Sequence, residues 1–460
     1  MNDYVKELTA LGLYQRLDLH QQFENGVNIL YGRNGAGKTT ILHILANVLN
    51  GDFQRFLHLN FRYIEVILSN GTTAQLTRRL DDQHNAEIEV KIDGPLPQSF
   101  TLKAPEPHDR RIRAFARQRM LELQETGRIT EVDPATEEPV PAVLPAAYFP
   151  AFRTMMEAWT SMEEQSRSTR FQAHEVSVKA TGFARKLFGS FVPSINYPSA
   201  LDIEQRLASE FRNAMFTVAR YDEELLSESF VQMFAALTRS VTEEVMPPEV
   251  ILDEIRSLYD RSSESSIQPQ GSQSVYARLQ TMLGTLKFTG TPEITAVRIL
   301  KVFRDALAKR AQIQEESFEV VNRYLDSVNE FLEGKRIDKK LTRRRPDPVI
   351  ILEFADGVSS SLRALSSGER QIVTLIYAAT HMNEQQVVLI DEPELSLHVD
   401  WQRKLLSRMS NQLGDRQIIA CTHSPVIGAD YEERRKQISP ERSNGSDLTR
   451  DDQIEHYPTE

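Results

Sequence analysis

The first 80 residues show a strand-like pattern of apolar positions that one helical segment interrupts. A β-rich run spans 26–31, and the apolar residues of 39–50 recur at helical spacing on one face. Further on, two β-rich runs flank Asn70 and Gly71, a pair typical of a two-residue hairpin turn because both residues tolerate positive φ. This part of the chain therefore predicts a sheet accompanied by an amphipathic helix.

From about residue 154 to 334 the pattern of apolar positions becomes helical. In its clearest part, 293–334, apolar residues at 3-4-3-4 spacing form one stripe: Phe318, Val321, Leu325, Val328 and Leu332. The stripe is too short for a long coiled coil, so it favours a packed bundle or a short helical hairpin. Strand character then returns, with one helix near 368–383, in three runs: 349–354, 386–391 and 417–422.

This alternation predicts an α/β fold, in which a head of mixed β-sheet plus helices is interrupted by a mostly α-helical insertion. A chain of 460 residues exceeds a typical single domain, which agrees with such a division. The last residues are polar and lack periodicity, so we expect a disordered tail. The expected order is a first head part, the insertion, a second head part and the tail: 1–154, 155–345, 346–432 and 433–460.

Composition and charge narrow the function classes. The net charge of −11 argues against a protein whose whole surface binds nucleic acid, so any such contact would need a local patch. No apolar run reaches the roughly 18–20 residues of a membrane span, and the N-terminus has no signal-peptide pattern, so we expect a cytoplasmic protein. Cys421 is the single cysteine, which excludes an internal disulfide and a Cys-based zinc site, and we expect it to be a buried core residue.

The segment "GRNGAGKT" (32–39) fits the phosphate-loop pattern G-x-x-x-x-G-K-[ST], with a predicted strand before it and a helix after it. Its glycines let backbone N–H groups wrap around phosphates at the positive end of the helix dipole. Lys38 would reach the β- and γ-phosphates, and Thr39 would bind Mg²⁺. The predicted ATP-binding residues are Gly32, Arg33, Asn34, Gly35, Ala36, Gly37, Lys38, Thr39 and Thr40.

A second chemical signal is "QVVLIDEPELSLH" (386–398), an apolar run that ends in Asp391 and Glu392. Adjacent residues of a strand point to opposite sides, so these two carboxylates have different tasks. Mg²⁺ prefers few carboxylates together with phosphate and water oxygens, which suits Asp391 as the metal residue. Glu392 is then the candidate general base that orients the attacking water. The alternative is a strand end with a solvated acidic loop.

The segment "LRALSSGERQIVTLIYAA" (362–379) places Ser-Ser-Gly at the start of a helix, which makes a second anion-binding end. "LSSGE" resembles the signature motif of ATP-binding-cassette (ABC) ATPases, and the other segments follow in that family's order. The resemblance implies that two heads sandwich ATP, with the signature of one subunit on the nucleotide of the other. The signature residues would be Ser366, Ser367, Gly368 and Glu369, and the D-loop residues Glu394, Leu395, Ser396 and Leu397.

The same resemblance gives roles to two further residues. His423 in "CTHSP" corresponds to the family's switch histidine, which senses the γ-phosphate or the attacking water; the alternative is a histidine satisfied by a backbone carbonyl. Arg153 in "YFPAFR" lies where the family's Q-loop should be and resembles the arginine of a P-x-[YF]-R segment in related bacterial ATPases. Arg153 is therefore a candidate for a nucleotide or interface contact, with a surface arginine as the alternative.

Three stretches, "GERQIVTLIYAA", "DEPELSLHVDWQ" and "THSP", resemble OLD-type ABC ATPases of bacterial anti-phage defence. OLD proteins continue into a TOPRIM nuclease domain, whereas here only a short polar segment follows, so we expect the effector to be a separate chain. This arrangement is similar to the ATPase subunits of PARIS systems, which work with a TOPRIM nuclease, and more distantly to Septu with its HNH partner. The implied partners are a second copy of the chain, a nuclease effector and a phage-encoded trigger.

The alternative is a RecF- or SMC-like repair ATPase that clamps DNA by ATP-driven head closure. The basic run 335–346 bears on this choice, since phosphate contacts there would favour repair and strong salt dependence. A solvated hairpin leading back into the head is the other interpretation of that run. The net acidity and the short insertion favour the defence function.

Overall fold

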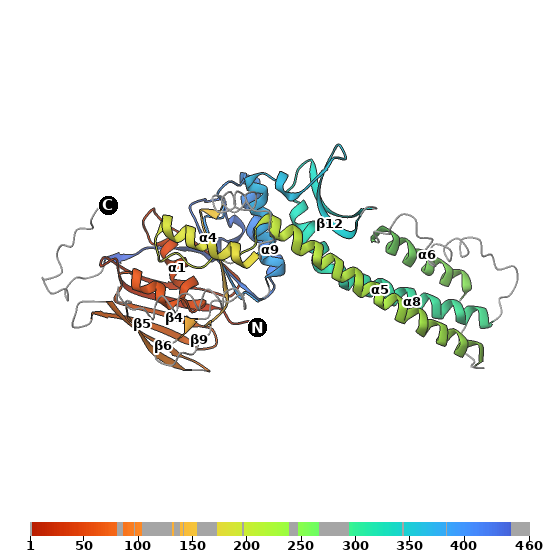
Figure 1. Ribbon diagram of the computed structural model, residues 1–460, viewed down its shortest axis with the longest axis horizontal. Helices are drawn as coiled ribbons and strands as arrows, with labels where there is room; N and C mark the ends of the chain where they lie inside the picture. Colours follow the sequence, from red (N-terminus) through yellow and green to blue (C-terminus); the bar gives the residue numbers. More distant parts are fainter. Residues whose placement is uncertain are drawn as a thin grey trace. The chain divides into compact units, whose positions relative to one another are not determined.

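The computed structural model describes residues 2–80, 86–95, 97–103, 131–132, 139–140, 142–153, 173–195, 197–238, 247–265, 294–342, 345–382 and 384–442. The chain forms two compact units (Figure 1). The head comprises Met1–Ser199 and Ser367–Glu460, and the helical unit comprises Ala200–Ser366. No helix among the described residues has the length and apolar character that a membrane crossing requires.

The head contains a seven-stranded antiparallel sheet and a five-stranded parallel sheet. The antiparallel sheet has the order β17-β2-β1-β4-β5-β6-β7, and the parallel sheet has the order β10-β14-β15-β3-β16. The strands of the antiparallel sheet are β1 (Val5–Leu13), β2 (Leu17–Gln22), β4 (Tyr63–Leu68), β5 (Thr73–Leu80), β6 (Ala86–Asp93), β7 (Gln98–Lys103) and β17 (Glu441–Arg442). Those of the parallel sheet are β3 (Val27–Tyr31), β10 (Ala146–Phe149), β14 (Val387–Asp391), β15 (Gln417–Thr422) and β16 (Arg435–Gln437), and β8 (Glu131–Val132) pairs with β9 (Pro139–Val140) apart from both sheets.

Burial follows the two sheet types. In the antiparallel strand β4, buried and half-buried residues alternate, so one face of the sheet packs on the core and the other is more exposed to solvent. Every residue of β14 and β15 is buried, as expected for parallel strands covered on both faces. Among the described residues, the helices of the head are α1 (Lys38–Leu49), η1 (Phe53–His58), α4 (Ala173–Phe188), α9 (Ser367–His381), α10 (Val399–Leu413) and η3 (Ala429–Arg434).

Helix α1 shares one apolar core with both sheets. Its Ile41 and Leu45 are fully buried in the same cluster as Leu8 of β1 and Leu389 of β14. The predicted amphipathic helix therefore packs its apolar face between the antiparallel and the parallel strands. The expected α/β head of mixed sheet plus helices is confirmed.

The end of the described chain differs from the expected disordered tail. Strand β16 pairs in parallel with β3, and β17 pairs antiparallel with β2. Ile438, between them, is buried in the main core, and its N–H donates to the Tyr31 carbonyl at 2.8 Å. Two short strands and one apolar side chain give too weak a pattern to find from sequence. The expectation is therefore wrong up to Arg442, and residues 443–460 lie outside the described part.

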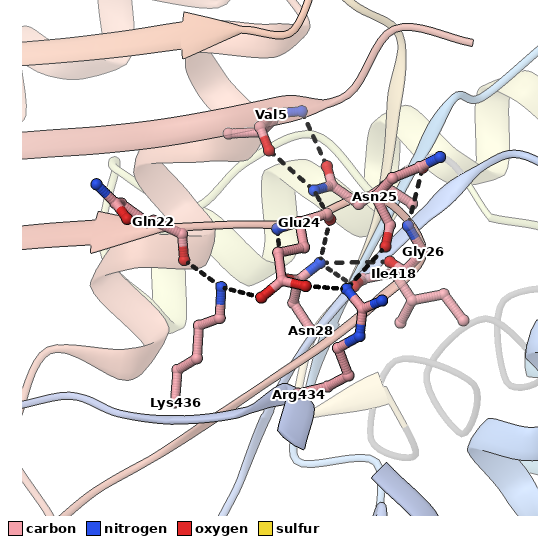
Figure 2. Close-up of polar contacts among 10 residues, drawn as sticks. Val5, Gln22, Glu24, Asn25, Gly26, Asn28, Ile418, Arg434 and Lys436 are labelled. Atoms are coloured by element: carbon pink, nitrogen blue, oxygen red, sulfur yellow. Dashed lines mark hydrogen bonds and ion pairs between the residues drawn. The ribbon is translucent and has the colours of Figure 1, made fainter. Parts of the chain in front are cut away.

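Polar contacts around the buried Gln417 and the exposed Glu24 join β1, the turn before β3, β15 and the segment 434–436 (Figure 2). Gln417 of β15 is fully buried; its amide accepts from the Val5 N–H at 3.0 Å and donates to the Val5 and Glu24 carbonyls, both at 2.9 Å. The Glu24 carboxylate pairs with Arg434, and Lys436 Nζ lies 3.4 Å from it. These contacts hold β1, the turn before β3, β15 and β16 in one corner of the head.

The helical unit is built on a long antiparallel helix pair. Helix α5 (Ala200–Thr238) packs along α8 (Ile294–Asn329), with a Phe211–Phe318 ring contact and an Arg310–Asp222 ion pair at 2.7 Å. The predicted stripe from Phe318 to Leu332 is buried throughout. The other elements in the described part of this unit are α6 (Pro248–Ser265), which packs on α8, and β11 (Lys335–Thr342), β12 (Arg345–Phe354), β13 (Ser359–Ser360) and η2 (Leu362–Ala364).

The two units divide the chain differently from the expected boundaries. Helix α4 belongs to the head, where its Ala180 and Ala184 pack with Val192 and Ile195. Strand β12 belongs to the helical unit, because it pairs along its length with β11 in a three-stranded sheet. The described residues of the basic run 335–346 thus belong to strand β11 and the start of β12.

Candidate functional site

The register of the parallel sheet brings the predicted chemical residues to one edge. Asp391, the last residue of β14, is opposite Cys421 of β15, which is opposite Leu30 of β3. The phosphate loop follows β3, Glu392 follows β14, and His423 follows β15. Carboxyl ends of parallel strands share one edge, where such sheets bind ligands.

The phosphate loop turns tightly between β3 and α1. Gly35 and Gly37 have φ of 78° and 89°, a left-handed conformation that side chains disfavour. Lys38 is 6% exposed, and its ammonium donates to the carbonyls of Gly32 at 2.9 Å and Arg33 at 3.1 Å. The lysine is thus folded over its own loop at the N-terminus of α1, where an anion is favoured.

Thr39 and Asp391 meet across the sheet edge although 352 residues separate them. The Thr39 hydroxyl donates to Asp391 Oδ2 at 2.9 Å. Burial raises the pKa of Asp391 to about 6, and the nearby Glu392 and Glu394 carboxylates add to the rise, while the Thr39 bond and Arg153 oppose it. The Thr39 hydroxyl and the buried Asp391 carboxylate fit Mg²⁺, which needs few protein oxygens. The described residues contain no cluster of three or more His, Cys, Asp or Glu that would suit another type of metal site.

We expect Asp391→Asn to stabilise the protein without nucleotide. Because the folded pKa of about 6 exceeds the ordinary 3.8, ionised Asp391 costs stability above pH 6, on the order of 2–3 kcal/mol, and this cost disappears as the pH falls toward 4. Urea unfolding of both proteins at pH 8 and pH 5 would measure the difference, which should shrink at pH 5. Mg-ATP should stabilise the unchanged protein and not the variant. A variant that is less stable at pH 8 would contradict this assignment.

Glu392 and His423 face each other at the same edge. His423 Nε2 lies 3.8 Å from Glu392 Oε1, and both side chains are about one-third exposed. Glu392 has φ of 46°, and its N–H donates to the Cys421 carbonyl at 2.8 Å, so the chain turns sharply just after β14. This turn directs the Glu392 carboxylate toward the histidine instead of continuing the strand. The pair lies beside the residues predicted to hold Mg²⁺ and is open to a water molecule.

Glu394 has a role that the sequence did not indicate. One oxygen of its carboxylate, Oε1, accepts from the N–H groups of His423 at 2.7 Å and Ser424 at 3.0 Å. The Ser424 hydroxyl in turn donates to Gln402 of α10 at 2.8 Å. Within one chain Glu394 therefore fixes the backbone that carries His423, whereas the family resemblance assigned it only to the D-loop. No local pattern predicts this, because the contact depends on the pairing of β14 with β15.

Arg153 is a buried residue that holds the acidic segment. It is 1% exposed, and its guanidinium donates to the carbonyls of Asp391 at 2.8 Å, Glu392 at 2.9 Å and Pro150 at 2.9 Å. The surface-arginine alternative is therefore wrong. Planar guanidinium donors suit adjacent carbonyls, so Arg153 orients the peptide between the two carboxylates. A direct nucleotide or interface contact of Arg153 stays a prediction.

The signature segment and the D-loop touch within the head. Helix α9 begins at Ser367, and both Ser366 and Ser367 are exposed, as a contact with another subunit would require. A side chain at Gly368 would lie 2.4 Å from the Ser396 carbonyl oxygen, and Ser396 has φ of 62°. Gln371, one turn on, donates to the Pro393 carbonyl at 2.8 Å. The start of α9 is therefore positioned by the backbone of the D-loop.

We expect Gly368→Ala to weaken ATP-dependent association of two heads and to lower hydrolysis about tenfold, because the new methyl group displaces the Ser396 backbone. ATP binding to a single head should be unchanged, since the phosphate loop is distant in sequence and untouched. Size-exclusion chromatography with ATP and a phosphate-release assay would measure both effects. Gly182→Ala is the matched control, because this glycine of α4 has open space around it. The higher helix propensity of alanine should stabilise the folded protein by up to about 1 kcal/mol. Wild-type association and turnover by Gly368→Ala would contradict the D-loop contact.

Tyr14 is a further candidate that no motif in the sequence indicates. It lies in the turn between β1 and β2 with φ of 51°, and its side chain is 50% exposed. The Tyr14 hydroxyl is 3.3 Å from the Thr40 hydroxyl, directly beside the phosphate loop. An exposed aromatic ring at this place can stack on a planar base. The sequence offered no signal, because the turn reaches the loop only through the fold.

Two family models match the chain. One, described as "AAA domain, putative AbiEii toxin, Type IV TA system", matches residues 179–430, more than half of the chain. The other, described as "AAA domain", matches residues 8–135. Together the two matches extend into both parts of the sequence that form the head.

Curated relatives share about a quarter of the chain. "Retron Ec83 probable ATPase" of Escherichia coli is 31% identical over 140 residues, which is 28% of this chain and 24% of that protein. "Retron Vc95 probable ATPase" of Vibrio cholerae serotype O1 biovar El Tor is 25% identical over 125 residues, 27% of this chain and 24% of that protein. The chain therefore spans about a quarter of the length of these relatives.

Among solved structures, the chain is similar to an Smc head domain with an extended coiled coil, bound to the C-terminal domain of ScpA, from Pyrococcus furiosus. The TM-score is 0.36 and the identity 13%, over 93% of this chain and 92% of that one. An Smc head domain with a coiled coil and joint from Pyrococcus yayanosii gives a TM-score of 0.32 at 13% identity, over 93% of this chain and 94% of that one.

Proposed function

The chain belongs to the family described as "AAA domain, putative AbiEii toxin, Type IV TA system". On that premise we propose that it is an ATPase of bacterial anti-phage defence. The observation that carries the proposal is the meeting of four residues from three distant segments: Thr39, Asp391, Glu392 and His423. Lys38 and the phosphate loop would bind the phosphates of ATP. Thr39 and Asp391 would hold Mg²⁺, whose positive charge stabilises phosphate oxygens.

In the proposed reaction, the Glu392 carboxylate orients a water molecule and accepts its proton as the water attacks the γ-phosphate. His423 contacts the same reacting region, with its backbone held by Glu394. Arg153 keeps the peptide between Asp391 and Glu392 in place. At this one sheet edge, Glu392 thus orients the water and accepts its proton, while Glu394 and Arg153 hold the backbone around it.

The proposed assembly is a head-to-head homo-oligomer of at least two copies. Its support is the exposure of Ser366 and Ser367 to solvent and the contact of α9 with the D-loop. Nucleotide binding would then bring heads together and hydrolysis would release them.

The retron names of the two curated relatives support a defence role. We propose that the assembly holds a separate nuclease effector of the TOPRIM type, as in PARIS systems, and releases it when a phage-encoded trigger is sensed. The OLD-like stretches of the sequence favour this over an HNH effector.

The test is purification of the tagged protein from its own operon with Mg-ATP, followed by mass spectrometry of co-purifying proteins and a phosphate-release assay. We expect ATP hydrolysis and a TOPRIM nuclease from a neighbouring gene. An HNH nuclease would replace PARIS by a Septu-like system. Nuclease-sensitive DNA without a protein partner would support the repair clamp, and absence of ATP binding would overturn the ATPase proposal itself.

A further inference from the structure

The signature segment is the place where the chain passes from one compact unit to the other. The boundary between the units lies between Ser366 and Ser367, inside "LSSGE". Whatever holds the residues just before Ser366 therefore connects the helical unit to the two serines that the proposed function places on ATP.

Glu204, in the second turn of α5, makes that connection. Its Oε2 accepts from the Ser361 hydroxyl at 2.8 Å and from the Leu362 N–H at 2.9 Å. Ser361 caps the short helix η2, because its hydroxyl oxygen also accepts from the Arg363 N–H at 3.3 Å. One carboxylate oxygen thus fixes the start of the turn that leads to the signature.

The turn is also packed firmly against its unit. Leu362 is fully buried and Leu365 is 2% exposed, while Ser366 beyond them is exposed. Only the four residues from Leu362 to Leu365 separate the Glu204 contact from Ser366, so the position of Ser366 follows that of the contact closely. A movement of the first turns of α5 would shift that serine.

Helix α5 can carry such a movement from far away. It has 39 residues, which at 1.5 Å per residue is about 58 Å, and it is paired along its length with α8. A partner that binds the far part of this pair and tilts it would act on Glu204 as a rigid lever.

We infer that Glu204 is a positioning residue that couples the helical unit to the signature serines, so that what binds the helical unit sets the rate of ATP hydrolysis between heads. This inference rests on the proposed function. Glu204 itself does not touch ATP; it acts through the turn Ser361–Leu365.

The test compares Glu204→Ala with Glu204→Gln, whose amide oxygen can accept the same two bonds. We expect Glu204→Ala to lower kcat about tenfold and to weaken ATP-dependent head association, because the turn loses its anchor, while binding of a fluorescent ATP analogue to single heads stays unchanged. Glu204→Gln should restore most of the activity. Ser361→Ala, which removes one of the two bonds, should give a smaller loss that is not additive with Glu204→Ala.

Glu228→Ala, at an exposed residue of the same helix, is the matched control and should behave as the unchanged protein. Unchanged kcat in Glu204→Ala would overturn the inference, and so would equal losses in both Glu204 variants accompanied by lower thermal stability. Absence of ATP binding by the unchanged protein would instead refute the proposed ATPase function, so the two failures are distinguishable.

Discussion

Glu392→Gln should bind ATP normally, hydrolyse it about 10²–10⁴-fold more slowly, and accumulate as a stable head-to-head dimer. The glutamine keeps the size of the side chain and so fits the tight turn after β14, where residue 392 has φ of 46°. It cannot accept the proton of an attacking water. Single-turnover hydrolysis and light scattering with ATP would measure the two effects separately.

Glu89→Gln is the control for this substitution. Glu89 lies on β6 in ion pairs with Lys91 and Arg79, away from the sheet edge that carries the site. It should hydrolyse ATP at the unchanged rate and show no trapped dimer. Normal turnover by Glu392→Gln would remove Glu392 as the base, and His423 would become the next candidate.

Lys38→Ala should lose ATP binding by at least about 100-fold, equivalent to about 3 kcal/mol, because charge-assisted bonds to phosphate are the strongest that the loop offers. The ammonium already lies within 3.1 Å of the loop carbonyls, so its loss also removes an internal support of the loop. Isothermal titration with ATP and with ADP would measure the affinity.

The control is Lys91→Ala on β6, which removes an exposed lysine of the same unit. Its ATP affinity should match that of the unchanged protein. Thermal unfolding of both variants without nucleotide separates loss of the phosphate contact from loss of the fold. Retained ATP affinity in a folded Lys38→Ala protein would mean that nucleotide binds elsewhere.

Residues of the candidate site could be predicted from the sequence where they lie at the end of a strand or at the start of a helix. The phosphate loop joins a strand to a helix, Asp391 and Glu392 end a strand, and Ser367 begins a helix, so each leaves a short readable pattern. The α/β fold and the apolar stripe that begins at Phe318 of α8 followed from periodicity for the same reason.

The remaining features depend on contacts between distant segments and left no such pattern. Burial of Arg153 follows from β10 pairing with β14, and Glu394 reaches the backbone of His423 only because β14 pairs with β15. Tyr14 reaches Thr40 through a hairpin turn. The unit boundary at Ser366 follows from the pairing of β12 with β11, which places 345–366 with the helices.

The order of strands in the parallel sheet sets the time at which this protein can fold during synthesis. Strand β3 has β15 and β16 as its neighbours, and Ile418 of β15 follows Asn28 of β3 by 390 residues. At about 5–20 residues per second, the ribosome needs about 20 to 80 s to make that stretch. Throughout this time the apolar residues of β3 lack the neighbouring strands that cover them in the folded head. The nucleotide site is begun when β3 and the phosphate loop are translated, and it is completed only after β15 has followed.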